Sequence, residues 1–315
     1  MTGESSSGSA KRCAFITGAT GFVGSHLTRR LVNEGWSVHI LVRSTSDRKL
    51  LKDLEGRFQP HVHNGKTEQL CTIMADVKPD VVFHLASLFL AQHHTKDILP
   101  LFESNLVFPA QLLEAMAKNR VTRLINMGTS WQHFENRGYS PVNLYAATKQ
   151  AFEDIIQYYV ETANLKAVTL KLYDTYGPDD PRPKLLALLL NTARTGQHLL
   201  MSPGEQLIDL VHVTDVVNAC LVASDYLYRR TNAGHNAFAV TTGKFVRLKD
   251  FVALFQKTAR KKLNIQWGSR PYRPREVMKP WDEGQLLPGW QPSISLENGI
   301  AELICKIRTT EQRDF

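Results

Sequence analysis

Short apolar runs alternate with amphipathic, helix-length segments through the first half of the chain. Five runs are typical of buried parallel strands, at 13–17, 38–42, 80–86, 123–128 and 167–173. Helical patterns lie between them, at 22–33, 66–77, 100–118 and 144–163. This alternation predicts an α/β fold, a Rossmann-type doubly wound parallel sheet connected by right-handed crossovers.

The pattern changes after residue 173. A Pro- and Asp-rich loop, "YGPDDPRP", precedes expected helices at 183–196 and 214–229 and a strand at 207–213, and Pro, Trp and Gly concentrate at 267–292. We expect a Rossmann domain over 12–173 with returning segments near 207–242, and a smaller substrate-binding lobe over 174–206 and 243–315. A cleft between the two is the natural ligand site.

The composition is that of an ordinary globular protein, with 43% hydrophobic and 22% charged residues. Residues 1–11 are Ser/Gly-rich and polar, which predicts a disordered tail without the apolar segment of a secretory signal. The longest apolar run, "LLALLL", is far shorter than the ~20 residues that cross a bilayer, so no membrane partner is expected. Four scattered cysteines without a C-x-x-C pair indicate reduced thiols and a cytoplasmic protein.

The charge pattern favours small anionic ligands over nucleic acid. The net charge is +8, but lysines and arginines are dispersed and no nucleic-acid-binding motif appears, so we expect no nucleic-acid partner. The histidine pairs His61/His63 and His93/His94 have no third ligand at a suitable spacing, and we predict no metal site.

A glycine-rich loop follows the first expected strand directly. In "ITGATGFVGSHL", Gly18, Gly21 and Gly24 are spaced as G-x-x-G-x-x-G and open a helix. Glycines permit a tight turn and close approach to a pyrophosphate, while the helix N-terminus supplies N–H donors. We predict a dinucleotide site here that also includes Thr20, Phe22 and Val23.

The end of the second expected strand bears on which dinucleotide binds. An acid at this position holds the ribose 2′-hydroxyl of NAD, but here Val42 is followed by Arg43. An arginine can pair with a 2′-phosphate, which an acid would repel. We therefore predict NADPH as cofactor, with NADH as the alternative.

A tyrosine and a lysine stand four residues apart in "NLYAATKQ". At this spacing Tyr145 and Lys149 share one face of a helix, so phenol and ammonium can reach one ligand. A bare Tyr-x-x-x-Lys is common by chance, and its meaning depends on the rest of the chain.

The landmarks together resemble the extended short-chain dehydrogenase/reductase family from about residue 11 onward. They are "TGATGFVGSHL", "VVFHLAS", "NLVFPAQLLEA", "YAATK" and "KLYDTYGPDDPR", in matching order and spacing. The resemblance implies that Tyr145 is the catalytic acid/base and that Lys149 binds the nicotinamide ribose and lowers the pKa of Tyr145. It implies a third catalytic hydroxyl at Ser130, with Thr129 as the alternative.

The same resemblance implies further cofactor residues. Leu85, Ala86 and Ser87 correspond to the strand end that lines the cofactor, and Asn105 to an asparagine beside it. Asn64 takes the place of an adenine-contacting acid. Family members often form homodimers through two helices, which would here be 100–118 and 144–163.

Three reactions compete within this family: 4-epimerisation, 4,6-dehydration and ketone reduction of nucleotide sugars. Dehydratases carry an Asp-Glu pair where this chain has Trp131 and Gln132, which argues against dehydration. NADPH favours net reduction. "MSPGEQLIDLVHVTDVV" and "YRPREVMKPW" resemble nucleotide-sugar 4-ketoreductases that make 3,6-dideoxyhexoses, such as CDP-abequose and CDP-paratose synthases. The expected reaction is reduction of the 4-keto group of a nucleotide-linked 4-keto-6-deoxyhexose, in deoxysugar biosynthesis such as that of lipopolysaccharide O-antigens.

The substrate residues follow from this comparison. Ile208 stands where the family often has a phosphate-binding arginine, so Arg273, with Arg182 or Arg270, is expected to contact the diphosphate. Asp174, in place of a family asparagine, and Gln132 are expected to contact the sugar.

Three alternatives stay open. A 4-epimerase would hold NAD tightly, and a reductase of the same family could act on a non-sugar carbonyl. A non-catalytic dinucleotide sensor would share the fold without the reaction, because fold alone does not establish catalysis.

Overall fold

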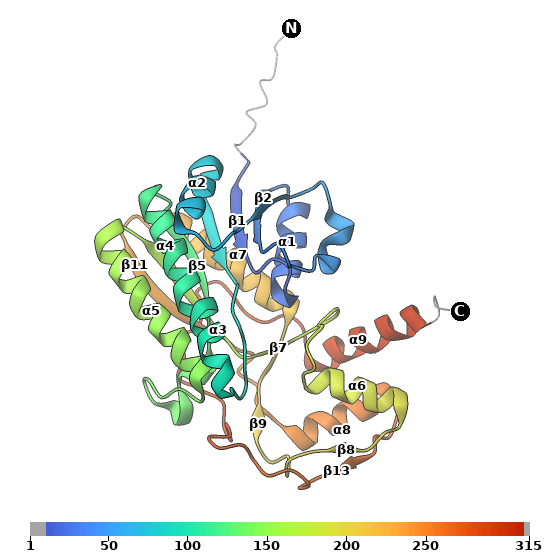
Figure 1. The fold of residues 1–315 in the computed structure, drawn as a ribbon. Coiled ribbons are helices and arrows are strands. Elements are labelled where there is room, and N and C mark those ends of the chain that lie inside the picture. Colours follow the sequence, from blue (N-terminus) through green and yellow to red (C-terminus); the bar gives the residue numbers. More distant parts are fainter. Residues whose placement is uncertain (1–10, 312–315) are drawn as a thin grey trace.

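The computed structural model describes residues 11–311, and its centre is a seven-stranded parallel sheet (Figure 1). The strand order is β11-β6-β5-β4-β1-β2-β3, and every neighbouring pair is parallel. The strands are β1 (Cys13–Thr17), β2 (Ser37–Val42), β3 (Gln59–Val62), β4 (Val81–His84), β5 (Arg123–Thr129), β6 (Lys166–Leu172) and β11 (Gly234–Val240). The order reverses between β1 and β4, which is where doubly wound sheets bind ligands. The predicted Rossmann-type fold is confirmed.

Helices cover both faces of the sheet (Figure 1). One face carries α2 (Thr67–Val77), α4 (Phe108–Lys118) and α5 (Leu144–Ala163), and the other carries α1 (Phe22–Asn33) and α7 (Val213–Arg229). Residues such as Phe15, Leu112 and Phe152 fill the first layer, while Leu27, Leu31 and Phe238 fill the second. Burial of both sheet faces explains why the strands read as continuous apolar runs.

A smaller lobe lies below the carboxyl edge of the sheet in Figure 1. It contains α6 (Leu185–Thr195), α8 (Leu248–Ala259), α9 (Leu296–Glu311) and three short strand pairs. These pairs join β7 (Asp174–Tyr176) to β10 (Leu210–His212), β9 (Leu207–Ile208) to β12 (Val246–Arg247), and β8 (Leu199–Leu200) to β13 (Ile265–Gln266). The lobe has its own core, which includes Tyr176, Leu189, Phe251 and Ile300.

Several elements differ from their sequence-based expectations. The expected helix over 100–118 is α3 (Ile98–Phe102), a π-helical turn over Glu103–Val107 and then α4. The expected strand over 207–213 is two short strands, β9 and β10, which pair with different partners. The strand β3 was not anticipated, because "QPHV" is short, polar and contains proline.

The expected tail over 1–11 lies, apart from Lys11, outside the described residues. Within 11–311, no helix is both long enough and apolar enough to cross a membrane.

Candidate active site

The glycine-rich loop connects β1 to α1 at the switch point of the sheet. Gly18 has φ +72°, and a Cβ there would lie 2.5 Å from the backbone nitrogen of Ala86, so only glycine allows β1 and the end of β4 to approach this closely. A Cβ on Gly24 would lie 2.1 Å from the Gly18 carbonyl oxygen. Gly21 is the N-cap of α1 and provides no side-chain cap, so the first amides of this helix remain available to an anion.

Arg43 and Asn64 follow two strands at the same edge of the sheet. Arg43 comes directly after β2, which runs parallel to β1 beside the glycine-rich loop, and its side chain is exposed. The Asn64 side-chain oxygen accepts a hydrogen bond from the Lys66 amide at 3.0 Å. Because β1, β2 and β3 are parallel, Arg43 and Asn64 lie at the carboxyl edge of the sheet, the same edge at which the glycine-rich loop begins.

The start of α5 is fixed by Asn143. Its side-chain oxygen accepts a hydrogen bond from the Ala146 amide at 2.9 Å, and its amide donates to the carbonyls of Leu90 and Ala91. This cap ties the helix to the loop after β4. The two residues expected on one helix face, Tyr145 and Lys149, line the same cavity.

The environment of Tyr145 includes the aromatic ring of Phe89 and the more distant charge of Arg182. The Phe89 ring meets the Tyr145 ring edge-on, with centroids 5.0 Å apart. Burial raises the pKa of Tyr145 to about 12, against smaller lowering effects from a hydrogen bond with Ser87 and the charge of Arg182. The phenol is therefore protonated at neutral pH, and the cation that acts on it here is Arg182 rather than Lys149.

Lys149 is only 3% exposed. Burial lowers the pKa of Lys149 to about 8, and the Glu153 carboxylate one turn further along α5 opposes this shift. Within residues 11–311 its ammonium makes no hydrogen bond or ion pair at normal distance. A buried ammonium without such a partner is costly, which indicates a place prepared for a polar ligand.

Thr129 is the last residue of β5 and Ser130 begins the turn that follows, and both line the cofactor cavity with Tyr145 and Lys149. The Thr129 hydroxyl accepts a hydrogen bond from the Trp131 amide at 3.3 Å, in the short turn that follows the strand. The Ser130 hydroxyl has no hydrogen-bond partner in the described part of the chain. Ser130 lines two cavities and Thr129 one, so Ser130 is the better placed of the two to meet a ligand.

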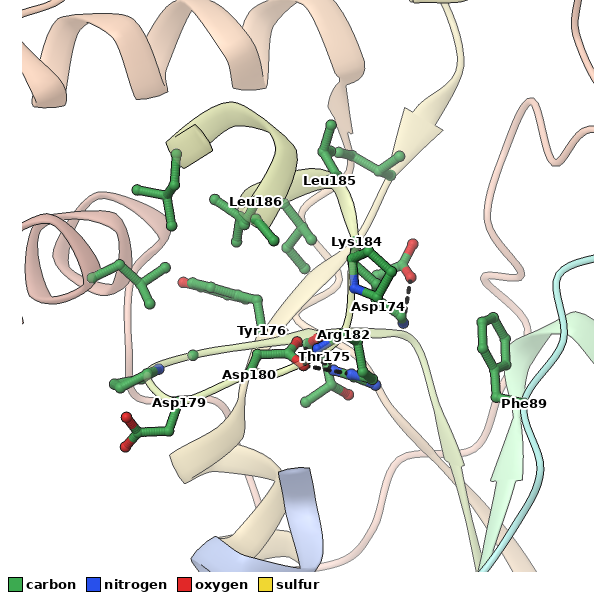
Figure 2. Close-up of a pocket in the computed structure, with 18 of the residues that line it drawn as sticks. Phe89, Asp174, Thr175, Tyr176, Asp179, Asp180, Arg182, Lys184, Leu185 and Leu186 are labelled. Atoms are coloured by element: carbon green, nitrogen blue, oxygen red, sulfur yellow. Dashed lines mark hydrogen bonds and ion pairs between the residues drawn. The ribbon is translucent and has the colours of Figure 1, made fainter. Parts of the chain in front are cut away.

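Three neighbouring cavities surround Trp131 and Asp174. The first, of about 250 Å³, runs from Gly18 and Gly24 to Tyr145 and is termed the cofactor cavity. The second, of about 580 Å³, lies between the β7–α6 loop, α6 and α9 and is termed the large cavity (Figure 2). The third, of about 210 Å³, is lined by Ser130 and several aromatic rings and is termed the aromatic cavity; its rings are Trp131, Phe134, Tyr173 and Trp281. Trp131 and Asp174 line all three.

Four cations line the large cavity, and each is held by a carboxylate. Arg182 donates to both oxygens of Asp180 at 2.7 Å, and Lys184 lies 3.5 Å from Asp174 (Figure 2). Arg273 donates to both oxygens of Glu276, which raises the pKa of Arg273, and Lys306 pairs with Asp179. These ion pairs hold four cationic groups in fixed positions around one cavity, with the charge of each offset by its carboxylate.

Three expected contacts are corrected by the structure. Gln132 is fully buried, with its amide bonded to Thr129, Gln150 and Glu153, so it cannot contact a substrate. Arg270 is exposed and lines none of the three cavities.

Asn105 is the third correction. It is 2% exposed, and its amide bonds Ser87, both backbone groups of Leu88 and the Thr148 hydroxyl. These four bonds use the full capacity of an amide side chain, so Asn105 acts by fixing the loop after β4 rather than by touching a cofactor.

The structure brings several of the other expected residues together and leaves some outside the cavities. Gly18, Gly21, Phe22, Val23, Gly24, Leu85 and Ser87 line the cofactor cavity, while Thr20 and Ala86 lie in the same loops but do not line it. Asp174 and Arg273 line the large cavity, and Arg182 lines both that cavity and the cofactor cavity.

Sequence reasoning missed several lining residues. Phe89 and Lys184 come from loops without periodicity, and Lys306 from the far end of the chain. The buried ion pair of Glu153 with Lys171, at 3.6 Å, had a signal: Glu153 continues the Tyr145–Lys149 face by one more turn.

The chain is similar to several enzymes that are named for nucleotide sugars. It is 25% identical over 292 residues to a CDP-abequose synthase of Salmonella muenchen, covering 92% of this chain and 96% of that protein. It is 23% identical over 316 residues to a UDP-glucose 4-epimerase of Halalkalibacterium halodurans, covering 90% and 92%. A solved structure of Thermus thermophilus UDP-glucose 4-epimerase, in complex with NAD, matches with a TM-score of 0.79 and 24% identity over 94% of this chain and 98% of that one.

Residues 14–234 match the family profile described as the NAD dependent epimerase/dehydratase family. The resemblance to extended short-chain dehydrogenases/reductases is thereby confirmed, and the chain belongs to the NAD dependent epimerase/dehydratase family.

Proposed function

We propose that the protein reduces the 4-keto group of a nucleotide-linked 4-keto-6-deoxyhexose with NADPH. The observation that carries this proposal is that Ser130, Tyr145 and Lys149 all line the cofactor cavity, which shares lining residues such as Trp131 and Asp174 with the cation-lined large cavity. The similarity to CDP-abequose synthases supports the substrate class.

The residues present suit a nicotinamide dinucleotide. The close approach at Gly18 and Gly24 leaves no room for side chains, and the first amides of α1 lack a side-chain cap. Lys149 offers a buried ammonium in the same cavity. When bound, the reduced nicotinamide supplies the hydride. Arg43, exposed after β2 where no acid is present, supports NADPH over NADH.

The chain's own residues would handle the proton and the developing charge. The Ser130 hydroxyl would donate a hydrogen bond to the carbonyl oxygen, which stabilises the negative charge that forms there. The Tyr145 phenol, protonated at neutral pH because its pKa is about 12, would give its proton to that oxygen. Lys149 would hold the ribose, and the charge of Arg182, which lowers the pKa of Tyr145, would favour the phenolate that remains.

The large cavity would hold the nucleoside diphosphate. Ile208 cannot bind phosphate, but Arg273, Lys184 and Lys306 line the same cavity. Apolar side chains of α6 form its other wall and suit a base. Asp174, at the junction of all three cavities, would accept a hydrogen bond from a sugar hydroxyl.

The second candidate is 4-epimerisation with tightly bound NAD. It is favoured by the similarity to UDP-glucose 4-epimerases over nine-tenths of the chain. The two reactions differ in the source of the hydride: a reductase consumes one NADPH for each product, whereas an epimerase returns to the sugar the hydride that its bound NAD first removed.

Deuterium transfer distinguishes them. Two preparations of NADPH, each deuterated on one face of the nicotinamide C4, would be supplied with nucleotide-linked 4-keto-6-deoxyhexoses and, separately, with the corresponding 4-hydroxy sugars, and products would be analysed by mass spectrometry. With one of the two preparations, a reductase adds one deuterium to the keto sugar for each NADPH consumed. Absence of deuterium in any product with both preparations, with the 4-hydroxy sugars isomerised at C4 without added NADPH, would contradict the proposal and support the epimerase.

We also propose a homodimer. Leu99, Val107 and Tyr158, on α3, the π-helical turn and α5, are 67%, 52% and 61% exposed. Such apolar exposure on neighbouring segments suits packing against a second copy. Sedimentation of the protein would show twice the chain mass.

A further inference from the structure

The β7–α6 loop places one cation against the dinucleotide loop as well as the large cavity. Arg182 belongs to the segment between β7 and α6, which forms the near wall of the large cavity (Figure 2). Its guanidinium carbon also lies 4.7 Å from the centroid of the Phe22 ring. Phe22 is the first residue of α1, so this arginine spans from the lobe to the phosphate-binding end of the Rossmann domain.

The guanidinium is held firmly from the lobe side. Nε and Nη2 each donate to an oxygen of Asp180 at 2.7 Å, and Nη2 also donates to the Thr175 carbonyl at 3.0 Å. Nη1 has no hydrogen-bond partner among residues 11–311. The Arg182 guanidinium is thus fixed through Nε and Nη2, and its Nη1 group can donate to an anion. Binding would cost little further conformational entropy of this side chain.

The other cations of the site are placed differently. Arg273 and Lys306 line the large cavity but not the cofactor cavity. Lys184 lines both, but its ammonium lies 5.0 Å from the Phe89 ring centroid, at the catalytic end. Among these four cations, Arg182 alone contacts α1, the helix whose first amides have no side-chain cap.

We propose that Arg182 binds the pyrophosphate of the dinucleotide, so that the substrate lobe supplies one ligand to the cofactor. This replaces the expectation that Arg182 serves the substrate diphosphate. The inference rests on the cofactor part of the proposed function but not on the identity of the sugar or on the direction of the reaction.

Direct binding tests this assignment without any turnover. Protein freed of nucleotide would be titrated with NADPH and with NADH, followed by the fluorescence of the reduced nicotinamide, and separately with CDP and UDP by calorimetry. The variants are Arg182→Gln, which removes the charge, and Arg182→Lys, which keeps it without the fork. Arg270→Gln is the matched control, since that arginine is exposed in the same lobe and lines none of the cavities.

We expect Arg182→Gln to raise the Kd of the preferred dinucleotide by about 10- to 100-fold, as loss of a hydrogen bond to a charged group does. Arg182→Lys should lose less, and Arg270→Gln should bind as the wild type does. The Kd values for CDP and UDP should change by less than about threefold in all variants, and thermal unfolding should confirm that each is folded.

Unchanged dinucleotide affinity in a folded Arg182→Gln variant would overturn the assignment, and weaker CDP or UDP binding alone would return Arg182 to the substrate. If Arg182→Gln does not fold, full dinucleotide affinity of a folded Arg182→Ala variant overturns the assignment in the same way. If the protein purifies with a bound dinucleotide, the amount retained per chain after gel filtration replaces the Kd. A protein that reduces no nucleotide sugar would disprove the proposed reaction and leave this binding result standing.

Discussion

Tyr145 and Lys149 lie one turn apart on α5, and burial shifts the pKa values of both side chains in opposite directions. Loss of water around them favours the neutral form of each group, so burial raises the pKa of Tyr145 to about 12 and lowers that of Lys149 to about 8. A protonated phenol suits donation of a proton to a reduced ketone. A poorly solvated ammonium suits binding of a polar ligand.

Replacement of Tyr145 by phenylalanine removes the proton donor and little else. We expect kcat to fall by about 10²- to 10⁴-fold, the usual contribution of general acid catalysis, while the dinucleotide Kd stays within about threefold. Stopped-flow turnover and fluorescence titration measure the two quantities. Tyr158→Phe, on the exposed side of the same helix, is the control, and near-wild-type turnover of Tyr145→Phe would contradict the mechanism.

Replacement of Lys149 by methionine should remove dinucleotide binding and increase the free energy of unfolding. Because the pKa of Lys149 is lowered on folding, the folded state binds this proton less firmly than the unfolded state. The free energy of unfolding therefore rises with pH between about 8 and 10.5, and a charged Lys149 is a cost below pH 8.

In the ligand-free protein at pH 7, Lys149→Met should increase the free energy of unfolding by about 1–3 kcal/mol and remove that pH dependence. It should also abolish measurable dinucleotide binding. Urea unfolding at pH 7 and pH 9.5 measures the first effect, with exposed Lys52→Met as control. A less stable Lys149→Met protein would show that the ammonium has a stabilising partner.

Among the elements of the fold, the positions of helices and of the glycine-rich loop could be predicted from neighbouring residues. The hydrogen-bond partners of side chains on different elements could not. The helix expected over 144–163 is observed as Leu144–Ala163, and the glycine spacing places the loop where expected, because both depend on neighbouring residues. Asn105 and Gln132 were misread because their partners lie on other elements, 17 to 43 and 18 to 21 positions away. Arg270 and Arg273 stand in one proline-rich loop, and no periodicity tells which of them faces a cavity.

The glycine-rich loop gives a prediction within one element. A Cβ on Gly24 would meet the Gly18 oxygen at 2.1 Å, whereas a Cβ on Gly21, with φ −83°, would meet the same oxygen at 3.3 Å. Gly24→Ala should therefore destabilise the protein by about 1–3 kcal/mol and lose dinucleotide affinity. The free energy of unfolding of Gly21→Ala should lie within about 1 kcal/mol of that of the wild type. Equal stability of the two variants by thermal unfolding would contradict the close packing of β1 and α1.

At the scale of the whole molecule, the site is built where the carboxyl edge of the sheet meets the lobe (Figure 1). The Rossmann part supplies the glycine-rich loop, Ser130 after β5 and Tyr145 on α5, and the lobe supplies the four cations of the large cavity. Neither part alone contains the large cavity, which is lined by Trp131 after β5 as well as by residues of α6 and α9.

The packed histidines make the whole fold sensitive to acid. Burial lowers the pKa of His84 to about 3, and those of His133 and His235 to about 4. Each imidazole is neutral when folded but protonates near pH 6.5 when unfolded, so stability is lost as pH falls below 6.5. Each contributes up to about 1.4 kcal/mol per pH unit.

Urea unfolding between pH 7 and pH 5 should show a steep fall in the free energy of unfolding. His84→Asn should reduce that slope, whereas exposed His93→Asn serves as the control. A slope that His84→Asn does not alter would mean that His84 titrates normally in the folded protein.

The proposed 4-keto reduction is best tested by oxidation of NADPH, followed by its absorbance, with a panel of CDP-, dTDP-, UDP- and GDP-linked 4-keto-6-deoxyhexoses and with NADH in parallel. We expect stoichiometric turnover of NADPH with at least one of these sugars, faster than with NADH, and its loss in Tyr145→Phe. No turnover on any of them, together with NAD released when the protein is denatured, would disprove the reductase and indicate an epimerase.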